Sequence, residues 1–188
     1  MLVGACGRDG VVTTPADDPS EVRTARLLLR RPAEADAPFV LALHSDPRTT
    51  SHNPSDALDD LAGAIERIRL WRGHWEQGLG YWIVEESATG APIGVCGVKA
   101  VDLHGMPSWN LLHRFSPAAQ GRGFAREAAR AAVAAGARVD VSRPVVARIR
   151  AENTASRRVA EALGMVRHPD LDLDGDDGRD EVWSTAAL

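Results

Sequence analysis

Residues 120–126, which read Gln-Gly-Arg-Gly-Phe-Ala-Arg, have the composition of an anion-binding turn. They follow a strand-like stretch, Ser108 to Phe115, and open an alanine-rich segment, Ala125 to Ala137, that is predicted to be helical. The first N–H groups of a helix have no partner within it, and the helix dipole adds partial positive charge beside them. Gly121 and Gly123 let the backbone approach a ligand closely. The expected ligand is therefore a phosphate or pyrophosphate.

Two common phosphate loops do not match this turn. A dinucleotide-binding fingerprint would need glycine where Arg126 stands, and a Walker loop would need lysine followed by serine or threonine. Arg122 and Arg126 add mobile positive charge. On its own, the turn could also serve only to connect a strand to a helix.

A second segment that could take part in chemistry begins at Asn153. Asparagine is a favoured helix N-cap, and Gly164 is a typical C-terminal stop, so a helix is predicted over Asn153 to Leu163. Ser156 places a hydroxyl in its first turn. Capping alone would explain Asn153 and Gly164.

Together, the two segments resemble the GNAT superfamily of acyl-CoA N-acyltransferases. Gln120, Gly123 and Ala125 match its Gln/Arg-x-x-Gly-x-Gly/Ala signature. The second helix matches the pattern Asn-x-x-Ser/Ala followed by Leu/Gly-aromatic, through Asn153, Ser156, Leu163, Gly164 and Met165. The stretch His44-Ser45-Asp46-Pro47 resembles the branch that acetylates ribosomal-protein N-termini. The resemblance extends from about Arg23 to Ser184.

The resemblance implies an N-acetyltransferase that transfers an acetyl group from its cosubstrate, acetyl-CoA, to a primary amine, without a metal. The acceptor would be a protein N-terminus or a small amine, and it would attack the thioester directly in a ternary complex. The pantetheine arm would lie along the strand near Leu112 to Phe115, and a backbone N–H at a break in that strand would stabilise the oxyanion. The residues expected to contact acetyl-CoA are Phe115, Gln120, Gly121, Arg122, Gly123, Phe124, Ala125, Arg126, Asn153 and Ser156.

The resemblance leaves the proton transfers open. Relatives often carry a tyrosine where this chain has Ala160 and a glutamate where it has Asn110. Ser156 is the expected catalytic group at the sulfur, and His113 is the first candidate base because its ordinary pKa suits neutral pH. His113 could equally face solvent or pack against a helix. A neutral amine that passes its proton to water is a further possibility.

Four side chains from the first two helices and their connection are expected to shape the acceptor pocket: His44, His52, Trp71 and Trp75. Trp71 and Trp75 are four residues apart, so they could form one aromatic wall. The alternative is that both tryptophans belong to the core.

The periodicity and the resemblance predict a mixed α/β (α+β) fold. We expect a central, mostly antiparallel sheet of six to seven strands, flanked by four helices, in one domain over residues 21–188. Residues 1–20 are expected to form a disordered tail. The expected strands are 25–31, 81–85, 92–101, 108–115, 144–150, 166–168 and 181–184, and the expected helices are 33–45, 58–76, 125–137 and 153–163.

The composition narrows the class of protein. A chain of 188 residues with 44% apolar residues can bury one core, and the net charge of −4 argues against a nucleic-acid-binding role. No stretch is long enough to span a membrane, and the two cysteines, Cys6 and Cys96, do not form a disulfide framework. A cytoplasmic monomer or homodimer is expected.

An acidic stretch near the C-terminus satisfies a calcium-loop pattern, Asp170-x-Asp172-x-Asp174-Gly175 with Glu181 at the last position. Pro169 precedes the loop where a helix would be required, and Asp177 stands where such loops are apolar. A solvated acidic hairpin turn is expected instead, and it could attract a cationic acceptor by long-range steering.

Other whole-protein hypotheses stay open from the sequence. The enzyme could transfer a bulkier acyl group such as succinyl. Because the usual tyrosine and glutamate are missing, the chain could instead be a CoA-binding module with weak catalysis. A calcium-regulated interaction protein is a further alternative.

Overall fold

The computed structural model describes residues 19–186, and its nine strands form one sheet. The strand order is β1-β2-β3-β4-β5-β6-β9-β7. Strand β8 pairs with the first residues of β9, on the side of β9 that faces away from β6. All pairings are antiparallel except that of β5 with β6. The strands are β1 (Glu21–Arg23), β2 (Leu27–Arg30), β3 (Tyr81–Glu86), β4 (Pro92–Leu103), β5 (Met106–Phe115), β6 (Val145–Arg150), β7 (Val166–Arg167), β8 (Leu173–Gly175) and β9 (Gly178–Ser184).

Five α-helices accompany the sheet, and their starts follow local capping chemistry. Asp60 accepts a hydrogen bond from the Gly63 N–H at the start of α3, and Asn153 does the same for the Ser156 N–H at α5. The helices are α1 (Ala37–Ser45), α2 (Pro47–Thr50), α3 (Leu61–His74), α4 (Phe124–Val139) and α5 (Thr154–Ala162), and the short 3₁₀ turns are η1 (Glu34–Asp36), η2 (Pro54–Asp56), η3 (Trp75–Gln77), η4 (Pro117–Ala119) and η5 (Pro169–Leu171).

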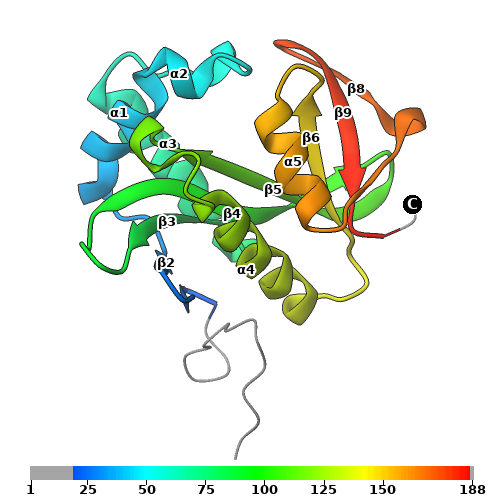
Figure 1. The fold of residues 1–188 in the computed structure, drawn as a ribbon, viewed down its shortest axis with the longest axis horizontal. Helices are drawn as coiled ribbons and strands as arrows, with labels where there is room; N and C mark the ends of the chain where they lie inside the picture. The colour runs from blue at the N-terminus through cyan, green and yellow to red at the C-terminus, as the bar shows by residue number, and fades with distance from the viewer. Residues whose placement is uncertain (1–18, 187–188) are drawn as a thin grey trace, which may run out of the picture.

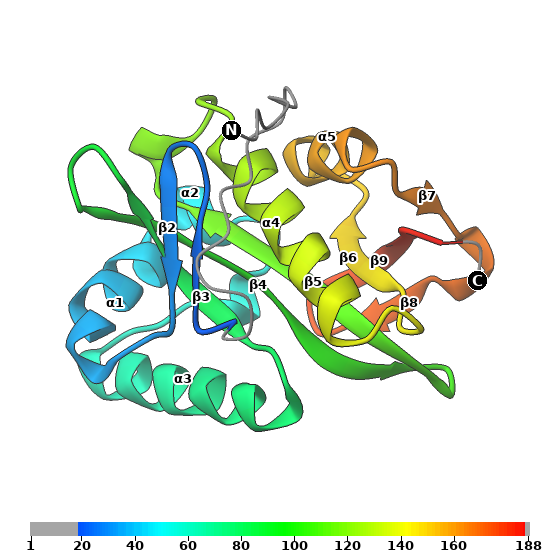
Figure 2. The same cartoon turned by 90° about the horizontal axis from the view of Figure 1, so that it is seen from below.

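The two faces of the sheet carry different helices. The alanine-rich helix α4 packs on β4 and β5 in the main core, to which α5 contributes Ala160. The opposite face packs on α1 and α3 in a second core that contains Tyr81, Ile83 and Val95. In Figure 2, α1 and α3 lie together beside β2 and β3, whereas α4 crosses β4 and β5 and α5 lies over β6.

The sheet splits between β5 and β6. The two strands are paired only at Trp109 with Val145 and at Asn110 with Val146, so the rest of β5, from Leu111 to Phe115, has no strand partner on that side among residues 19–186. Figure 1 shows the two strands diverging beyond this point, with the start of α4 near the free end of β5. The split positions one open strand edge next to the glycine-rich turn.

The expected mixed class and mostly antiparallel sheet are confirmed. The sheet has nine strands rather than six to seven, because β1 pairs with β2 and because the acidic stretch supplies β8 as well as the start of β9. The five helices exceed the expected four through the one-turn helix α2. The expected tail over residues 1–20 lies, except for Pro19 and Ser20, outside the described residues, as does Cys6. The single-domain boundary stays a prediction.

Candidate active site

The glycine-rich turn has the backbone geometry of a helix-start anion site. Gly121 (φ 74°) and Gly123 (φ 79°) both adopt left-handed conformations, and Gly123 is the N-cap of α4. A Cβ added at Gly121 would meet no described heavy atom within 4 Å, so the turn is open there. The Gln120 side-chain amide donates to the Phe115 carbonyl at 3.0 Å, which ties the turn to the end of β5. The side chain of Gln120 thus holds the turn in place through a hydrogen bond inside the protein.

Glu127, in the first turn of α4, fixes the turn to the β1–β2 connection. Its carboxylate accepts hydrogen bonds from Thr24 Oγ1 at 2.6 Å, from the Arg26 N–H at 2.9 Å and from Arg26 Nε at 2.7 Å. Burial raises the pKa of Glu127, but these hydrogen bonds outweigh it and hold the pKa below its ordinary value. Arg26 Nη1 also donates to the Arg122 carbonyl at 2.9 Å. The backbone of the turn is therefore held rigid from the side.

The predicted ligand-binding side chains of the turn are not all free. Phe124 is buried in the core, with the Arg26 and Arg122 guanidinium groups 4.6 and 4.5 Å from its ring centroid. Arg122 also bonds Glu86 at 2.5 Å. Exposed Arg126 forms no ion pair with any residue between 19 and 186. Phe124 and half-buried Ala125 can therefore offer a ligand only their backbone groups. Arg126 can offer the positive charge of its side chain.

The open edge of β5 is the second part of the site. The Trp109 N–H donates to the Pro144 carbonyl at 2.9 Å, so the backbone groups of Trp109 face β6. Backbone groups alternate sides along a strand, so those of Leu111 and His113 face the same way, beyond the last β5–β6 pair. An extended ligand can add to such an edge through backbone hydrogen bonds.

Helix α5 borders the split from the other half of the sheet. Asn153 Oδ1 accepts the Ser156 N–H at 3.0 Å, so this asparagine is engaged as a helix cap. Ser156 is half-buried, and its hydroxyl bonds no other described group. Ala160, one turn later, is buried in the main core.

Comparison with known proteins decides the family. A family model described as an acetyltransferase (GNAT) domain matches residues 26–166.

The chain belongs to the GNAT acetyltransferase family.

Its activity is therefore acetyl transfer from acetyl-CoA to an amine. The chain is 34% identical, over 145 residues, to the uncharacterized protein YkkB of Bacillus subtilis (strain 168), a match that covers 76% of this chain and 83% of YkkB. Its fold is similar to that of an acetyltransferase from Agrobacterium tumefaciens, with a TM-score of 0.75, 26% identity and coverage of 96% and 100% of the two chains. RimL, a ribosomal L7/L12 alpha-N-protein acetyltransferase solved with coenzyme A, shares the fold at 16% identity, a TM-score of 0.71 and coverage of 86% of this chain and 94% of RimL.

His113, the candidate base of this GNAT enzyme, lies on the α4 face of the sheet. Its side chain is on the same face of β5 as those of Trp109, Leu111 and Phe115, which belong to the main core under α4. Desolvation lowers the pKa of His113 to about 4. The imidazole is therefore neutral at physiological pH but weakly basic. Asn110, at the position where relatives often carry a glutamate base, points to the other face.

The four residues predicted for the acceptor pocket separate into three places. Buried His44 lies against Trp71, with ring centroids 5.6 Å apart, and its Nδ1 bonds the Val40 carbonyl at 3.0 Å. Trp75 instead packs edge-on against Trp82, at 5.1 Å, in the main core. His52 is half-buried and uses its carbonyl to accept a hydrogen bond from Arg150 Nε at 3.3 Å.

Trp71 and Trp75 consequently do not form one aromatic wall. The α-helix ends at His74, and Trp75 begins the 3₁₀ turn η3, so the spacing of four residues no longer places both rings on one face. Trp71 contacts Tyr81 edge-on, at 6.0 Å, in the second core. Burial lowers the pKa of His44 to about 4, helped by the positive charge of Arg114.

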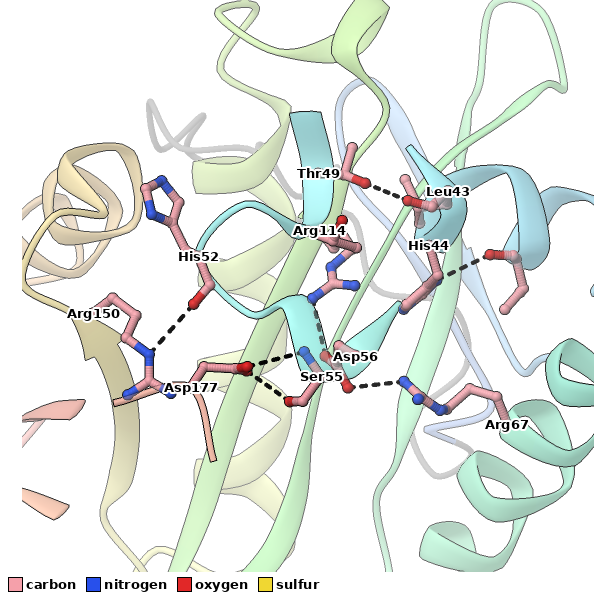
Figure 3. Close-up of polar contacts among 12 residues, drawn as sticks. Leu43, His44, Thr49, His52, Ser55, Asp56, Arg67, Arg114, Arg150 and Asp177 are labelled. Carbon is pink, nitrogen blue, oxygen red and sulfur yellow. Dashed lines mark hydrogen bonds and ion pairs between the residues drawn. The ribbon is translucent and has the colours of Figure 1, made fainter. Parts of the chain in front are cut away.

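The segment between α2 and α3 carries site residues that the sequence did not single out. Asp56 bonds Arg114 Nη2 at 2.9 Å and Arg67 Nη1 at 3.0 Å (Figure 3). Ser55 donates both its N–H, at 3.0 Å, and its hydroxyl, at 2.6 Å, to the carboxylate of Asp177 in the β8–β9 turn. This segment therefore crosses from α1 and α3 to the far half of the sheet.

The acidic stretch forms a tight hairpin, with β8 and β9 joined at Gly175 and Gly178. Its carboxylates bond separate partners: Asp172 is paired with Arg167, Asp177 with Ser55 and Asp180 with Arg150. Among residues 19–186, no three His, Cys, Asp or Glu side chains are grouped as a metal site would require. In the same range, no helix combines the length and apolar character needed to span a bilayer.

Proposed function

We propose that this enzyme acetylates a small primary amine by direct attack on acetyl-CoA in a ternary complex, at the split between β5 and β6. The observation that supports this most strongly is the meeting of the free β5 edge with the left-handed glycine turn at the start of α4. One feature suits an extended pantetheine arm and the other suits a pyrophosphate. A single ligand that carries both groups accounts for the arrangement.

The cosubstrate would be held mainly by backbone. The N–H groups of residues 121–125 would bind the pyrophosphate, with Arg126 as the free charge and Gln120 holding the turn against Phe115. The thioester supplies an activated acetyl group, and a β5 backbone N–H near Leu111 would stabilise the oxyanion. Ser156 is proposed to donate a hydrogen bond from its hydroxyl to the departing sulfur, which leaves as the thiolate, and Asn153 fixes the start of its helix.

The acceptor would approach from the α1–α3 face, where Asn110 lies. The amine nitrogen attacks the thioester carbon, a C–N bond forms, the C–S bond breaks, and the amine proton leaves to water. Alignment of both substrates removes much of the entropic barrier. We assign no base role to His113, because its pKa is near 4 and its side chain lies on the opposite face. The amine would react from its neutral fraction, so the rate should rise with pH up to the amine's own pKa.

The test is calorimetric titration of acetyl-CoA into Gly121→Asp and Gly121→Asn. Both residues tolerate the left-handed conformation, and they differ in charge rather than size. We chose Gly121 because a Cβ at Gly123 would lie 3.5 Å from Arg26 Nη2, which would neutralise an introduced carboxylate. The site is supported if the aspartate variant binds acetyl-CoA about a hundredfold more weakly than wild type while the asparagine variant stays within about fivefold. Each tenfold change in affinity corresponds to about 1.4 kcal/mol.

Equal binding by wild type and both variants would remove the pyrophosphate assignment. Acetyl-CoA binding without release of thiol on any amine would favour the CoA-binding module. Titration with succinyl-CoA in the same cell tests the bulkier acyl group. The cytoplasmic location, the monomeric or homodimeric state and the absence of a nucleic-acid role stay predictions from the sequence.

A further inference from the structure

The acceptor face of the split carries an excess of positive charge. Alternation along the strands places Lys99 of β4, Asn110 and Arg114 of β5, and Arg148 of β6 on the face opposite α4. Arg67 reaches the same region from α3, through Asp56. Asp56 is paired with Arg67 and Arg114 and its charge also acts on Lys99, whereas the carboxylate that acts on Arg148 is Asp180.

Two of the four cations have no direct carboxylate partner among the described residues, although the charge of Asp56 acts on Lys99 and that of Asp180 on Arg148. Within residues 19–186, Lys99 and Arg148 form no salt bridge or side-chain hydrogen bond. Burial is the main cause that lowers the pKa of Lys99, with the Arg148 charge adding to it and Asp56 partly opposing it. Arg150, the next cation on β6, is by contrast paired with Asp180 at 2.9 Å. The charge left over is therefore centred on Lys99 and Arg148.

Two buried polar atoms on the same face also lack partners. Arg114 has only 9% of its side chain exposed, and its Nη1 bonds nothing in the described chain, although Nη2 is paired with Asp56. Asn110 is 8% exposed, and its Oδ1 likewise bonds no described group. The side chain of Asn110 is also hydrogen-bonded to Tyr81. Burial raises the pKa of Tyr81, and this hydrogen bond offsets part of the increase. Buried groups of this kind normally have partners, so a ligand is the natural candidate.

The register places these groups around one point. Lys99 is directly opposite Asn110 on β4, and Arg148 lies two residues beyond Val146, the partner of Asn110 on β6. Directly opposed residues in a sheet are about 5 Å apart, and although β6 diverges from β5 beyond Val146, the Arg148 charge still acts on Lys99. The Asn110 acceptor thus lies between two cations, at the place where the sheet splits.

We propose that the acceptor is a small amine that also carries a carboxylate, as an amino acid does. This inference rests on the proposed function. Lys99 and Arg148 bind the carboxylate, with Arg114 Nη1 as a further donor, and Asn110 Oδ1 accepts an N–H of the amine. A cationic acceptor such as a diamine is repelled by the same charges, because the two carboxylates nearest them are already engaged: Asp56 with Arg67 and Arg114, and Asp180 with Arg150.

The covering segment limits the size of the acceptor. Ser55 is joined to Asp177, and the His52 carbonyl to Arg150, so residues 52–56 close this face between the two halves of the sheet (Figure 3). A compact acceptor fits beneath this segment better than a folded protein surface does. The proposal therefore commits to a small molecule.

The test compares three acceptors of equal length: 4-aminobutyrate, butylamine and 1,4-diaminobutane, with the common amino acids as a second set. Thiol release from acetyl-CoA gives kcat/KM, and calorimetry gives the affinity for acetyl-CoA. We expect 4-aminobutyrate or an amino acid to exceed butylamine by at least about tenfold, and the diamine to be poorest. If acetyl-CoA binds but no carboxylate-bearing amine is preferred, the inference is wrong while the proposed function stands; if acetyl-CoA does not bind, the proposed function itself fails.

Variants locate the effect. Lys99→Met and Arg148→Met keep the apolar stems, and each should lower kcat/KM for the carboxylate-bearing amine about tenfold without changing that for butylamine or the affinity for acetyl-CoA. Arg130→Met removes one exposed charge from α4, on the other face, and should change nothing. Equal loss with Arg130→Met, or a peptide that outperforms every small amine, would overturn the assignment.

Discussion

The two faces of the split are built by different means. The cosubstrate face consists of a glycine turn, a helix start and a bare strand edge, all within residues 111–126, and most of its ligand groups are backbone. The acceptor face is assembled from charged side chains on α3, β4, β5, β6 and η2. Binding through the backbone does not depend on the identity of the side chains, whereas a site built from charged side chains can be changed one residue at a time. On the assignment that we propose, specificity for the acceptor therefore belongs to the second face.

The largest effect should come from the carboxylate that holds the acceptor face together. Asp56→Asn leaves the nearly buried Arg114 without its counter-charge, which should lower the free energy of unfolding by about 3 kcal/mol. Urea denaturation measures the change. Asp59→Asn, in the same segment but exposed and unpaired among the described residues, is the matched control and should fall within about 0.5 kcal/mol of wild type. Similar losses in both variants would show that Asp56 does not support this face.

A pH-dependent effect should also belong to the acceptor face. The pKa of His44 is near 4 in the folded protein and 6.5 in its ordinary state, so below pH 6.5 the unfolded chain binds the extra proton. The free energy of unfolding should therefore fall as the pH drops from 6.5 to 4. His44→Phe removes the one proton that this histidine takes up on unfolding, so the slope against pH should decrease by about 1.4 kcal/mol per pH unit. Urea midpoints at several pH values measure the slope, and parallel curves for the two proteins would contradict the assignment.

Asn110→Asp should alter the choice of acceptor without touching the cosubstrate face. A carboxylate between Lys99 and Arg148 would neutralise the charge that we assign to substrate recognition. We expect kcat/KM to fall about tenfold for 4-aminobutyrate and to rise for 1,4-diaminobutane. Steady-state kinetics on the two amines gives the ratio, and calorimetry with acetyl-CoA serves as the internal control. A ratio that does not move would separate Asn110 from the acceptor.

The smallest effect should come from Arg126, which is exposed and forms no ion pair among residues 19–186. Arg126→Gln should weaken acetyl-CoA binding about three- to fivefold, less so at high salt, because an exposed charge is screened. Arg130→Gln, one turn further along α4, should leave the affinity unchanged. Calorimetry at low and high salt distinguishes the two, and equal effects would mean that only the total charge of the helix matters.

The sequence predicted the cosubstrate face better than the acceptor face, for a physical reason. Positive-φ glycines and a helix start leave a local pattern, so Gly121, Gly123 and the start of α4 could be recognised without a structure. Side chains alternate along β5, so His113 lies on the same face as Trp109. Which face this is can be known only when the pairing of the strand with its neighbours is known. The separation of Trp71 from Trp75 arises where α3 tightens into η3, which residue spacing does not reveal.

The acceptor cluster left no local signal. Asp56, Lys99 and Arg148 are ordinary charged residues far apart in the sequence, and only the sheet brings them together. Strands β1 and β8, three residues each, exist because a neighbour supplies their hydrogen bonds rather than because of their composition. The long strands and α4 and α5 were predictable because their hydrophobic periods are regular.

The short pairing of β5 with β6 also has a consequence for how the chain acquires its shape. Strands β1 to β5 follow one another in the sheet in their order along the chain, so this half of the sheet needs no strand from the later part of the chain. The contact of Ser55 with Asp177 joins residues 122 positions apart, and it can form only after the last hairpin has been added. Strand β6 covers only the first residues of the outer edge of β5, and open edges of this kind pair readily with other chains unless a ligand or another segment occupies them. The cosubstrate that we propose for this edge would therefore also act as its cover, and the acceptor face is completed last, when the hairpin reaches Ser55.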